Sequence, residues 1–238
     1  MPLAQTPKII FENVSLERGG ARVFDALDLT LGEQRIGLIG ANGSGKSSLL
    51  RLINALLLPD AGRVLTCGHD TREARAMLPR IAGFLFQNPD HQILFPTIGE
   101  EIEFGLRENG LDKKDAAQRA RAIMQRHGWE GWDSRPVHEL SEGQKQKLCF
   151  MAVLALSPQV LLLDEPFASL DLKARREFLK LMFESGCQIV MASHDLDMLQ
   201  NFDRILWLER GRIRSDGAPR DVLAAYRQEA IGEEALAS

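Results

Sequence analysis

Long apolar runs are scarce in this sequence, and so are the marks of a secreted protein. The longest run, Leu148–Leu156, has nine residues, whereas a helix that crosses a bilayer needs about 20. The first residues, 1–8, lack the charged and then apolar pattern of a secretory signal. We therefore expect a chain without a leader that cannot span a membrane by itself.

Cysteine is also scarce: the chain has three, and their wide spacing argues against a disulfide framework or a metal cluster. Each of Cys67, Cys149 and Cys187 lies within or beside apolar sequence. We interpret them as reduced thiols in the core of a cytoplasmic protein. The histidines outside any motif show no metal-ligand spacing either: His69, His91, His127 and His138.

A strong excess of charge of one sign is absent too. The 238 residues include 29 Lys and Arg and 33 Asp and Glu, for a formal net charge of -4. A mildly acidic chain is not drawn to nucleic acid by its bulk charge, so we expect no nucleic-acid partner. Hydrophobic residues make up 45% and charged residues 26%, as in ordinary globular proteins with a sizeable core.

What the sequence does contain is an alternation of apolar strand patterns and helical patterns. A hairpin turn is predicted at Gly19-Gly20, a helix over 46–57, and a helical, charged segment between about 97 and 155. Strand patterns cover 8–14, 23–31, 35–39, 81–86, 160–163, 188–192 and 205–208. Because buried strands joined by helices form parallel sheets, we predict an α/β fold with a mostly parallel sheet. An N-terminal antiparallel region and an inserted α-helical subdomain would complete it.

The segment Gly40–Ser47 matches the phosphate-binding pattern G-x-x-x-x-G-K-[ST] at every fixed position, between a strand and a helix. Glycines let backbone N–H groups surround a polyphosphate, and the helix N-terminus adds positive partial charge. Lys46 would reach the β- and γ-phosphates, and the Ser47 hydroxyl would bind Mg²⁺. A glycine turn that merely caps a helix is the alternative. The residues assigned to nucleotide binding here are Gly40, Asn42, Gly43, Ser44, Gly45, Lys46, Ser47 and Ser48.

Two acidic residues, Asp164 and Glu165, follow the apolar strand 160–163. They are therefore expected at the carboxyl edge of the parallel sheet, where α/β proteins bind their ligands. Asp164 would hold Mg²⁺, and Glu165 would take a proton from the attacking water. A solvated strand end is the alternative interpretation of this pair.

Further motifs make the sequence resemble the ATPases of ATP-binding cassette (ABC) transporters. Leu140–Lys147, here called the signature segment, is similar to the L-S-G-G-Q motif of that family. Gln87 lies in an F-Q-N-P stretch, Ser169-Leu170-Asp171 follows the paired acids, and His194 follows an apolar strand. These elements stand in the order that the family has. The resemblance implies a P-loop NTPase fold and hydrolysis of ATP with Mg²⁺.

The same resemblance implies one cassette over 1–238, with a nucleotide-binding core of 1–86 and 159–238 and a helical subdomain of 87–158. His194, in the core, would hydrogen-bond the γ-phosphate as a third catalytic residue beside Glu165 of the core and Gln87 of the helical subdomain. Gln87 would touch Mg²⁺ or the attacking water.

The signature segment implies a second copy of the chain. In the family, residues matching Ser141, Gly143 and Gln144 face the ATP that another subunit holds, and Asp171 would couple the two sites. The chain would then act as a head-to-tail homodimer. Two departures stand out: Glu142 replaces the first glycine of the motif, and Arg18 takes the place of the aromatic that stacks on adenine. A guanidinium plane can also stack on a base, so Arg18 is a candidate adenine contact.

Two stretches, 86–92 and 96–106, resemble those of energy-coupling-factor (ECF) importers, which take up vitamins and transition-metal ions in prokaryotes. The resemblance implies two membrane partners, a transmembrane coupling protein and a separate substrate-binding subunit, and thus a peripheral position on the cytoplasmic face of the inner membrane. Among the single-ATPase members for cobalt, nickel and biotin, we favour biotin. Glu100 and Glu101, beside Glu103, would dock arginines of the coupling protein; a solvated acidic helix start is the alternative.

The alternative function is that of a soluble ABC ATPase in DNA repair or translation. Repair members carry long coiled-coil insertions and translation members usually two cassettes, and this chain has room for neither. A P-loop GTPase would carry an N-K-x-D motif, which is absent. Trp129 and Trp132 are predicted to pack inside the helical insertion.

Overall fold

The computed structural model describes residues 8–167 and 170–236, with side chains up to Glu229. The chain folds into two compact units. Unit 1 comprises the described parts of Met1–Ala82, Gln159–Glu165 and Gln188–Ser238. Unit 2 comprises the described parts of Gly83–Pro158 and Pro166–Cys187. The predicted domain boundaries, with a helical subdomain of 87–158, stay a prediction.

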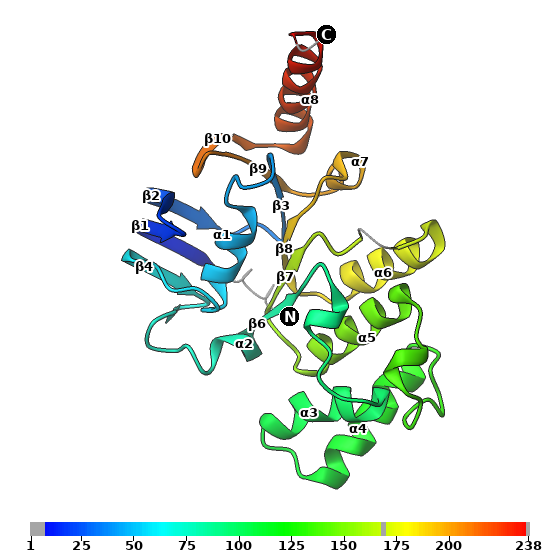
Figure 1. Cartoon of the computed structure of the whole chain (residues 1–238). Helices are drawn as coiled ribbons and strands as arrows, with labels where there is room; N and C mark the ends of the chain where they lie inside the picture. The colour runs from blue at the N-terminus through cyan, green and yellow to red at the C-terminus, as the bar shows by residue number, and fades with distance from the viewer. Residues whose placement is uncertain (1–7, 168–169, 237–238) are drawn as a thin grey trace, which may run out of the picture. The chain divides into compact units, whose positions relative to one another are not determined.

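Unit 1 begins with an antiparallel sheet in the order β2-β1-β4-β5 (Figure 1). Its first two strands form the predicted hairpin, with Arg18 paired to Ala21 across the turn. Both turn glycines have positive φ, 57° at Gly19 and 77° at Gly20, as a two-residue hairpin turn requires. The strands are β1 Ile9–Arg18, β2 Ala21–Leu31, β4 Ala61–Thr66 and β5 His69–Asp70.

The second sheet has six strands in the order β10-β9-β3-β8-β7-β6. Pairings of β3 with β8 and β9, and of β7 with β8, are parallel, whereas β9 and β10 are antiparallel. Every residue of β7 and β8 is buried, which explains why their sequences are apolar apart from Asp164 at the end of β7 and Gln188 at the start of β8. The strands are β3 Arg35–Ile39, β6 Ala82–Leu85, β7 Val160–Asp164, β8 Gln188–Ala192, β9 Arg204–Glu209 and β10 Arg212–Gly217. The mixed α/β architecture confirms the predicted fold class.

Four helices of unit 1 follow these strands: α1 Lys46–Ile53, α2 Leu78–Ile81, α7 Leu196–Leu199 and α8 Pro219–Leu236. The helix predicted over 46–57 is too long, because α1 ends at Ile53. Ala55 then takes a positive φ of 61°, which no helix continues through. Three strands and one long helix of this unit, β4, β5, β10 and α8, carry no prediction from the sequence.

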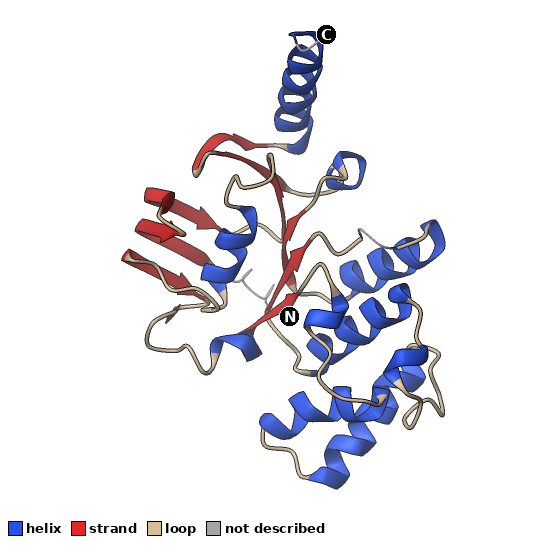
Figure 2. Ribbon diagram, in the orientation of Figure 1, coloured by secondary structure: helices blue, strands red, loops and turns tan. Residues whose placement is uncertain are grey.

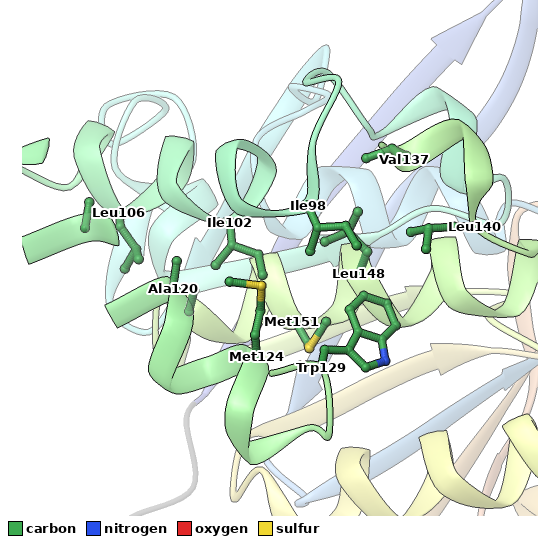
Figure 3. Close-up of a cluster of buried hydrophobic side chains, with 12 residues drawn as sticks. Ile98, Ile102, Leu106, Ala120, Met124, Trp129, Val137, Leu140, Leu148 and Met151 are labelled. Carbon is green, nitrogen blue, oxygen red and sulfur yellow. The ribbon is translucent and has the colours of Figure 1, made fainter. Parts of the chain in front are cut away.

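Unit 2 is built from helices α3 Ile98–Glu108, α4 Lys113–Arg126, α5 Glu142–Ala155 and α6 Leu172–Glu184, with 3₁₀ turns at Pro89–His91 and Val137–Glu139. Figure 2 shows only helices and loops from α3 to α5, as the sequence predicts. Their apolar faces share one core, in which Ile102, Met124 and Met151 lie together (Figure 3). Trp129 is buried in that core and stacks on Trp132 with ring centroids 5.0 Å apart, so the packing role predicted for both is confirmed.

The three cysteines are free thiols, and Cys149 and Cys187 are buried. The prediction of a core position is wrong for Cys67, which is half-buried in the turn after β4 with a φ of 51°. Burial raises the pKa of the Cys67 thiol to about 11. The thiol is therefore protonated near neutral pH.

Candidate functional site

The loop after β3 has a backbone that only glycine allows. Gly40 has a φ of 138°, and a Cβ on it would lie 2.1 Å from the carbonyl oxygen of Leu208. Gly43 and Gly45 have φ values of 80° and 110°, a region that other residues rarely enter. The motif glycines are therefore required by the shape of the loop.

This loop ends on the N-terminus of α1, where Gly45 is the N-cap residue and no side chain caps the helix. The first turn of α1 holds no acidic residue. Nearby, the hydroxyl of Ser44 is buried, and no described residue pairs with it. A helix start with uncapped N–H groups and an unpaired hydroxyl donor favours an anion, and a phosphate fits that chemistry.

Lys46 is buried at the start of α1, and its Nζ donates to the carbonyl oxygens of Gly40 at 2.6 Å and Ala41 at 3.1 Å. Burial lowers the pKa of the Lys46 amine, while the carboxylates of Glu165 and Asp164 act in the opposite direction. The amine thus lies inside the loop, beside the two acids that the sequence assigns to the same site.

Ser47 and Asp164 meet at this place. The Ser47 hydroxyl donates to Asp164 Oδ1 at 2.9 Å, so the first turn of α1 is joined to the end of β7. A hydroxyl and a carboxylate are hard oxygen ligands of the kind that Mg²⁺ prefers. The donor set fits the predicted metal.

Glu165 follows β7 in a strained conformation, with a φ of 50°. Its backbone N–H donates to the Ala192 carbonyl at 3.0 Å, and its Oε2 accepts from the N–H of His194 at 3.2 Å. Its Oε1 lies 3.3 Å from His194 Nε2, without hydrogen-bond geometry. The ends of β7 and β8 therefore bring Glu165 and His194 together, and one carboxylate oxygen keeps lone pairs for a proton.

The signature segment lies in unit 2, at the start of α5. Ser141 is the N-cap residue: its hydroxyl accepts from the N–H of Gln144 at 3.3 Å, and Gln144 Oε1 accepts from the N–H of Ser141 at 3.0 Å. This reciprocal pair is a capping box. Glu142 lies in the first turn, where the helix dipole favours a carboxylate.

A cavity of about 350 Å³ opens beside this helix start, lined by Ser141, Gly143 and Gln144 among others. Asp171 also lines it, and as N-cap residue of α6 it accepts from the N–H of Ala174 at 2.8 Å. A Cβ on Gly143 would lie 3.4 Å from Leu170 and 3.6 Å from Ala174. The predicted signature and coupling residues thus gather at one cavity of unit 2; Ser169 lies outside the described residues.

The chain as a whole is similar to known proteins. A family model for the ABC transporter matches residues 24–168. The chain belongs to this family. It is 47% identical to the biotin transport ATP-binding protein BioM of Rhodobacter capsulatus, over 90% of this chain and 92% of that protein. It is 34% identical to the energy-coupling factor transporter ATP-binding protein EcfA of Methanocaldococcus jannaschii, over 80% of this chain and 71% of that protein.

A solved structure gives the same result. CbiO1 from Clostridium perfringens, described as part of the ABC transporter complex CbiONQ, matches with a TM-score of 0.79 and 29% identity. The match covers 96% of this chain and 94% of that one. The protein is therefore an ATP-binding subunit and ATPase of an ABC transporter. Within residues 8–167 and 170–236, no helix has the length and apolar character needed to cross a membrane.

Other residues that the sequence assigns to this ABC ATPase are exposed or half-buried. Asn42 is exposed in the phosphate loop, and Ser48 is half-buried in α1. Arg18 is exposed at the end of β1, and Gln87 is exposed in the loop after β6. The roles assigned to these residues stay predictions.

The two predicted docking acids of the ABC ATPase differ sharply. Glu100 is exposed and accepts from the Thr97 hydroxyl at 2.6 Å. Glu101 is only 8% exposed, and its Oε2 accepts from the N–H groups of Leu94 and Phe95, both at 2.9 Å. Burial raises the pKa of Glu101, and these two hydrogen bonds oppose that shift. The burial counts against direct docking by Glu101, whose carboxylate instead holds the loop before α3.

Proposed function

We propose that the protein is the ATP-hydrolysing subunit of an ECF-type importer for biotin, acting as a homodimer on a transmembrane coupling protein and a separate substrate-binding subunit. The observation that supports biotin as the substrate is the 47% identity to a biotin transport ATP-binding protein, of which the chain covers 92%. The ECF type rests further on the likeness to an energy-coupling factor protein. The complex would place the chain on the cytoplasmic face of the inner membrane. No observation favours a role in DNA repair or translation.

In this proposal Glu165 acts as the general base. The free lone pairs of its Oε1 take the proton of the water that attacks the γ-phosphorus, and the bond to the β-phosphate oxygen breaks to release ADP. The His194 N–H holds the other oxygen, Oε2, at 3.2 Å. His194 would also donate to the γ-phosphate, which requires only that its exposed ring turn.

Lys46 and the phosphate loop bind and orient the nucleotide. The amine would exchange its two carbonyl partners, Gly40 and Ala41, for β- and γ-phosphate oxygens. Ser47 and Asp164 would hold Mg²⁺, which supplies charge neutralisation on the phosphates when bound. Gln87 would reach Mg²⁺ or the attacking water, and Arg18 would stack on adenine.

A second copy completes the site in this proposal. The capping box leaves the N-terminus of α5 with a fixed geometry, to which Ser141, Gly143 and Gln144 contribute. Helix N-termini stabilise phosphate, and the resemblance assigns this one to ATP held by the other copy. Asp171, on the same cavity, would couple the two sites.

The experiment that tests the substrate is uptake by cells that express the whole transporter. We expect accumulation of labelled biotin that stops when the Glu165→Gln variant replaces the wild-type chain, because transport needs hydrolysis. Labelled cobalt and nickel are measured in the same cells. Uptake of either metal without uptake of biotin would overturn the substrate and keep the ECF type.

The start of unit 2 offers a surface for the coupling protein, here called the docking surface: Leu94, Phe95, Glu100 and Phe104. Leu94 is 70% exposed and Phe104 40% exposed, and the rings of Phe95 and Phe104 lie 4.9 Å apart. Glu100 and Phe104 share one face of α3, four residues apart. An acidic residue beside exposed apolar side chains suits a basic, amphipathic helix of the partner.

We expect Glu100→Lys to lower the yield of the co-purified membrane complex by about tenfold, because like charges across an interface oppose association. Glu108→Lys is the matched control, since it makes the same charge change on the exposed far end of α3. Yields are compared by pulling down the tagged ATPase from detergent extracts. Equal yields for both variants would remove Glu100 from the docking surface.

A further inference from the structure

The loop that carries Gln87 is fastened to α5 on both sides of that residue. Before it, the Phe86 carbonyl accepts from Gln146 Nε2 at 3.2 Å, and the Phe86 N–H donates to Gln92 Oε1 at 3.2 Å. After it, Asp90 pairs with Lys145 of α5 at 2.7 Å. Gln87 therefore lies on a short span between two fixed points, so a change in its position is mainly a rotation of its side chain.

Gln146 is almost fully buried, with 3% of its surface exposed, and the orientation of its amide is fixed. The Phe86 carbonyl can only accept a hydrogen bond, so Nε2 must face it and Oε1 must face away. Oε1 is buried, and no described residue donates a hydrogen bond to it. A buried acceptor without a donor destabilises the conformation that contains it.

The side chains that line a small hollow beside Gln146 identify the donor for its Oε1. The hollow has no room for a water molecule. Its lining side chains include one other that carries N–H groups, that of Gln87; the rest are Pro89, Glu142, Pro166 and Leu170. The backbone N–H of Gln87 is no candidate, because in a trans peptide it points away from the Phe86 carbonyl and hence from Gln146.

We propose that Gln146 is a positioning residue that sets the availability of Gln87. The side chain of Gln87 is exposed in the structure; in the nucleotide-free protein a rotation turns its amide inward, where it donates to Gln146 Oε1. To reach the nucleotide, Gln87 must break its hydrogen bond to Gln146 Oε1. The strength of this hydrogen bond therefore sets the fraction of protein molecules that are ready to bind ATP. This inference rests on the proposed function, because that proposal places Gln87 at the nucleotide. It does not depend on which substrate is transported.

The first test uses the full-length chain and no Gln146 variant. Side-chain amides of ¹⁵N-glutamine-labelled protein are observed by NMR, and the Gln87 signal is assigned from its loss in Gln87→Glu. We expect slow hydrogen exchange of the Gln87 amide without nucleotide, and a shifted Gln87 amide signal when ATP and Mg²⁺ are added in a Glu165→Gln background. Exchange at the rate of an exposed glutamine without nucleotide would overturn the proposal. The NMR sample contains no biotin, transported metal or membrane partner. Its result therefore does not depend on the outcome of the uptake experiment.

The second test is a double-mutant cycle. Gln146→Met keeps the length of the side chain and removes the acceptor, so the apparent Kd for ATP should fall about fivefold, as expected when one hydrogen bond no longer holds the incompetent state. In a Gln87→Ala background the same substitution should leave the Kd unchanged. A Kd shift of equal size with and without Gln87 would show a purely structural effect and refute the proposal.

Discussion

Replacing Glu165 with glutamine is expected to slow ATP hydrolysis by roughly 10²–10⁴-fold, the usual contribution of a general base. Glutamine has the same shape, and its side-chain oxygen can keep the hydrogen bond from the His194 N–H, now 3.2 Å long. What it loses is the ability to take a proton. The rate is measured as phosphate release at saturating ATP.

The same variant reports on the dimer. Because binding groups such as Lys46 and Ser47 are untouched, ATP still binds, and slow hydrolysis should trap two chains around two ATP molecules. Light scattering after gel filtration with ATP and Mg²⁺ should then give twice the mass of the chain. Glu184→Gln, an exposed carboxylate on α6, is the control that should hydrolyse normally and stay monomeric. Full turnover by Glu165→Gln would remove Glu165 as the base.

The part of the site in unit 1 could be predicted from the sequence because its chemistry depends on contiguous segments. The phosphate loop needs glycine at Gly40, where a Cβ would lie 2.1 Å from a backbone oxygen, and that need is visible as a motif. Asp164 follows an unbroken apolar strand, and parallel pairing then brings it to Ser47. The local motifs, together with the rule that α/β proteins bind ligands at the carboxyl edge of a parallel sheet, were sufficient to predict this part of the site.

The roles of Glu101 and Gln146 could not be predicted in the same way. An acidic residue in the first turn of a helix is normally predicted to be exposed to solvent. Glu100 and Glu101 are neighbours in the same turn, so the sequence predicts the same environment for both. The structure separates them because the loop before α3 turns two N–H groups, of Leu94 and Phe95, toward Glu101. Gln146 is likewise explained by the distant Phe86 carbonyl. Contacts that depend on the path of a loop leave no periodicity in the sequence.

The strands that the sequence did not predict share a physical cause. The first half of β4 is exposed, and β10 alternates between exposed and half-buried residues; both contain charged and small residues such as Arg63 and Asp216. Strands of this kind lack the buried apolar alternation on which pattern recognition depends. The helix end at Ile53 was missed for the opposite reason, since Leu56 and Leu57 continue an apolar pattern that the backbone at Ala55 interrupts.

Replacing Lys46 with alanine is expected to weaken ATP binding by about 10- to 100-fold, the range for hydrogen bonds from a charged donor. Calorimetry measures the Kd, and AMP serves as the control ligand, because an amine that contacts only the β- and γ-phosphates leaves the affinity for AMP unchanged. Equal losses for ATP and AMP would indicate a collapsed loop rather than a lost charge. Lys180→Ala, an exposed lysine of α6, should bind both nucleotides normally.

The burial of Lys46 adds a dependence on pH to this prediction. Burial lowers the pKa of the Lys46 amine in the free protein, so the amine is neutral once the pH exceeds that lowered pKa. Phosphate binding favours the protonated amine. Above the lowered pKa, the protein must therefore take up a proton when ATP binds. The Kd for ATP should therefore increase at alkaline pH below the ordinary lysine range. Lys46→Arg stays charged at every pH of the experiment, so its Kd should not vary over that range, whatever its absolute affinity. A parallel rise for wild type and Lys46→Arg would assign the titration to another group.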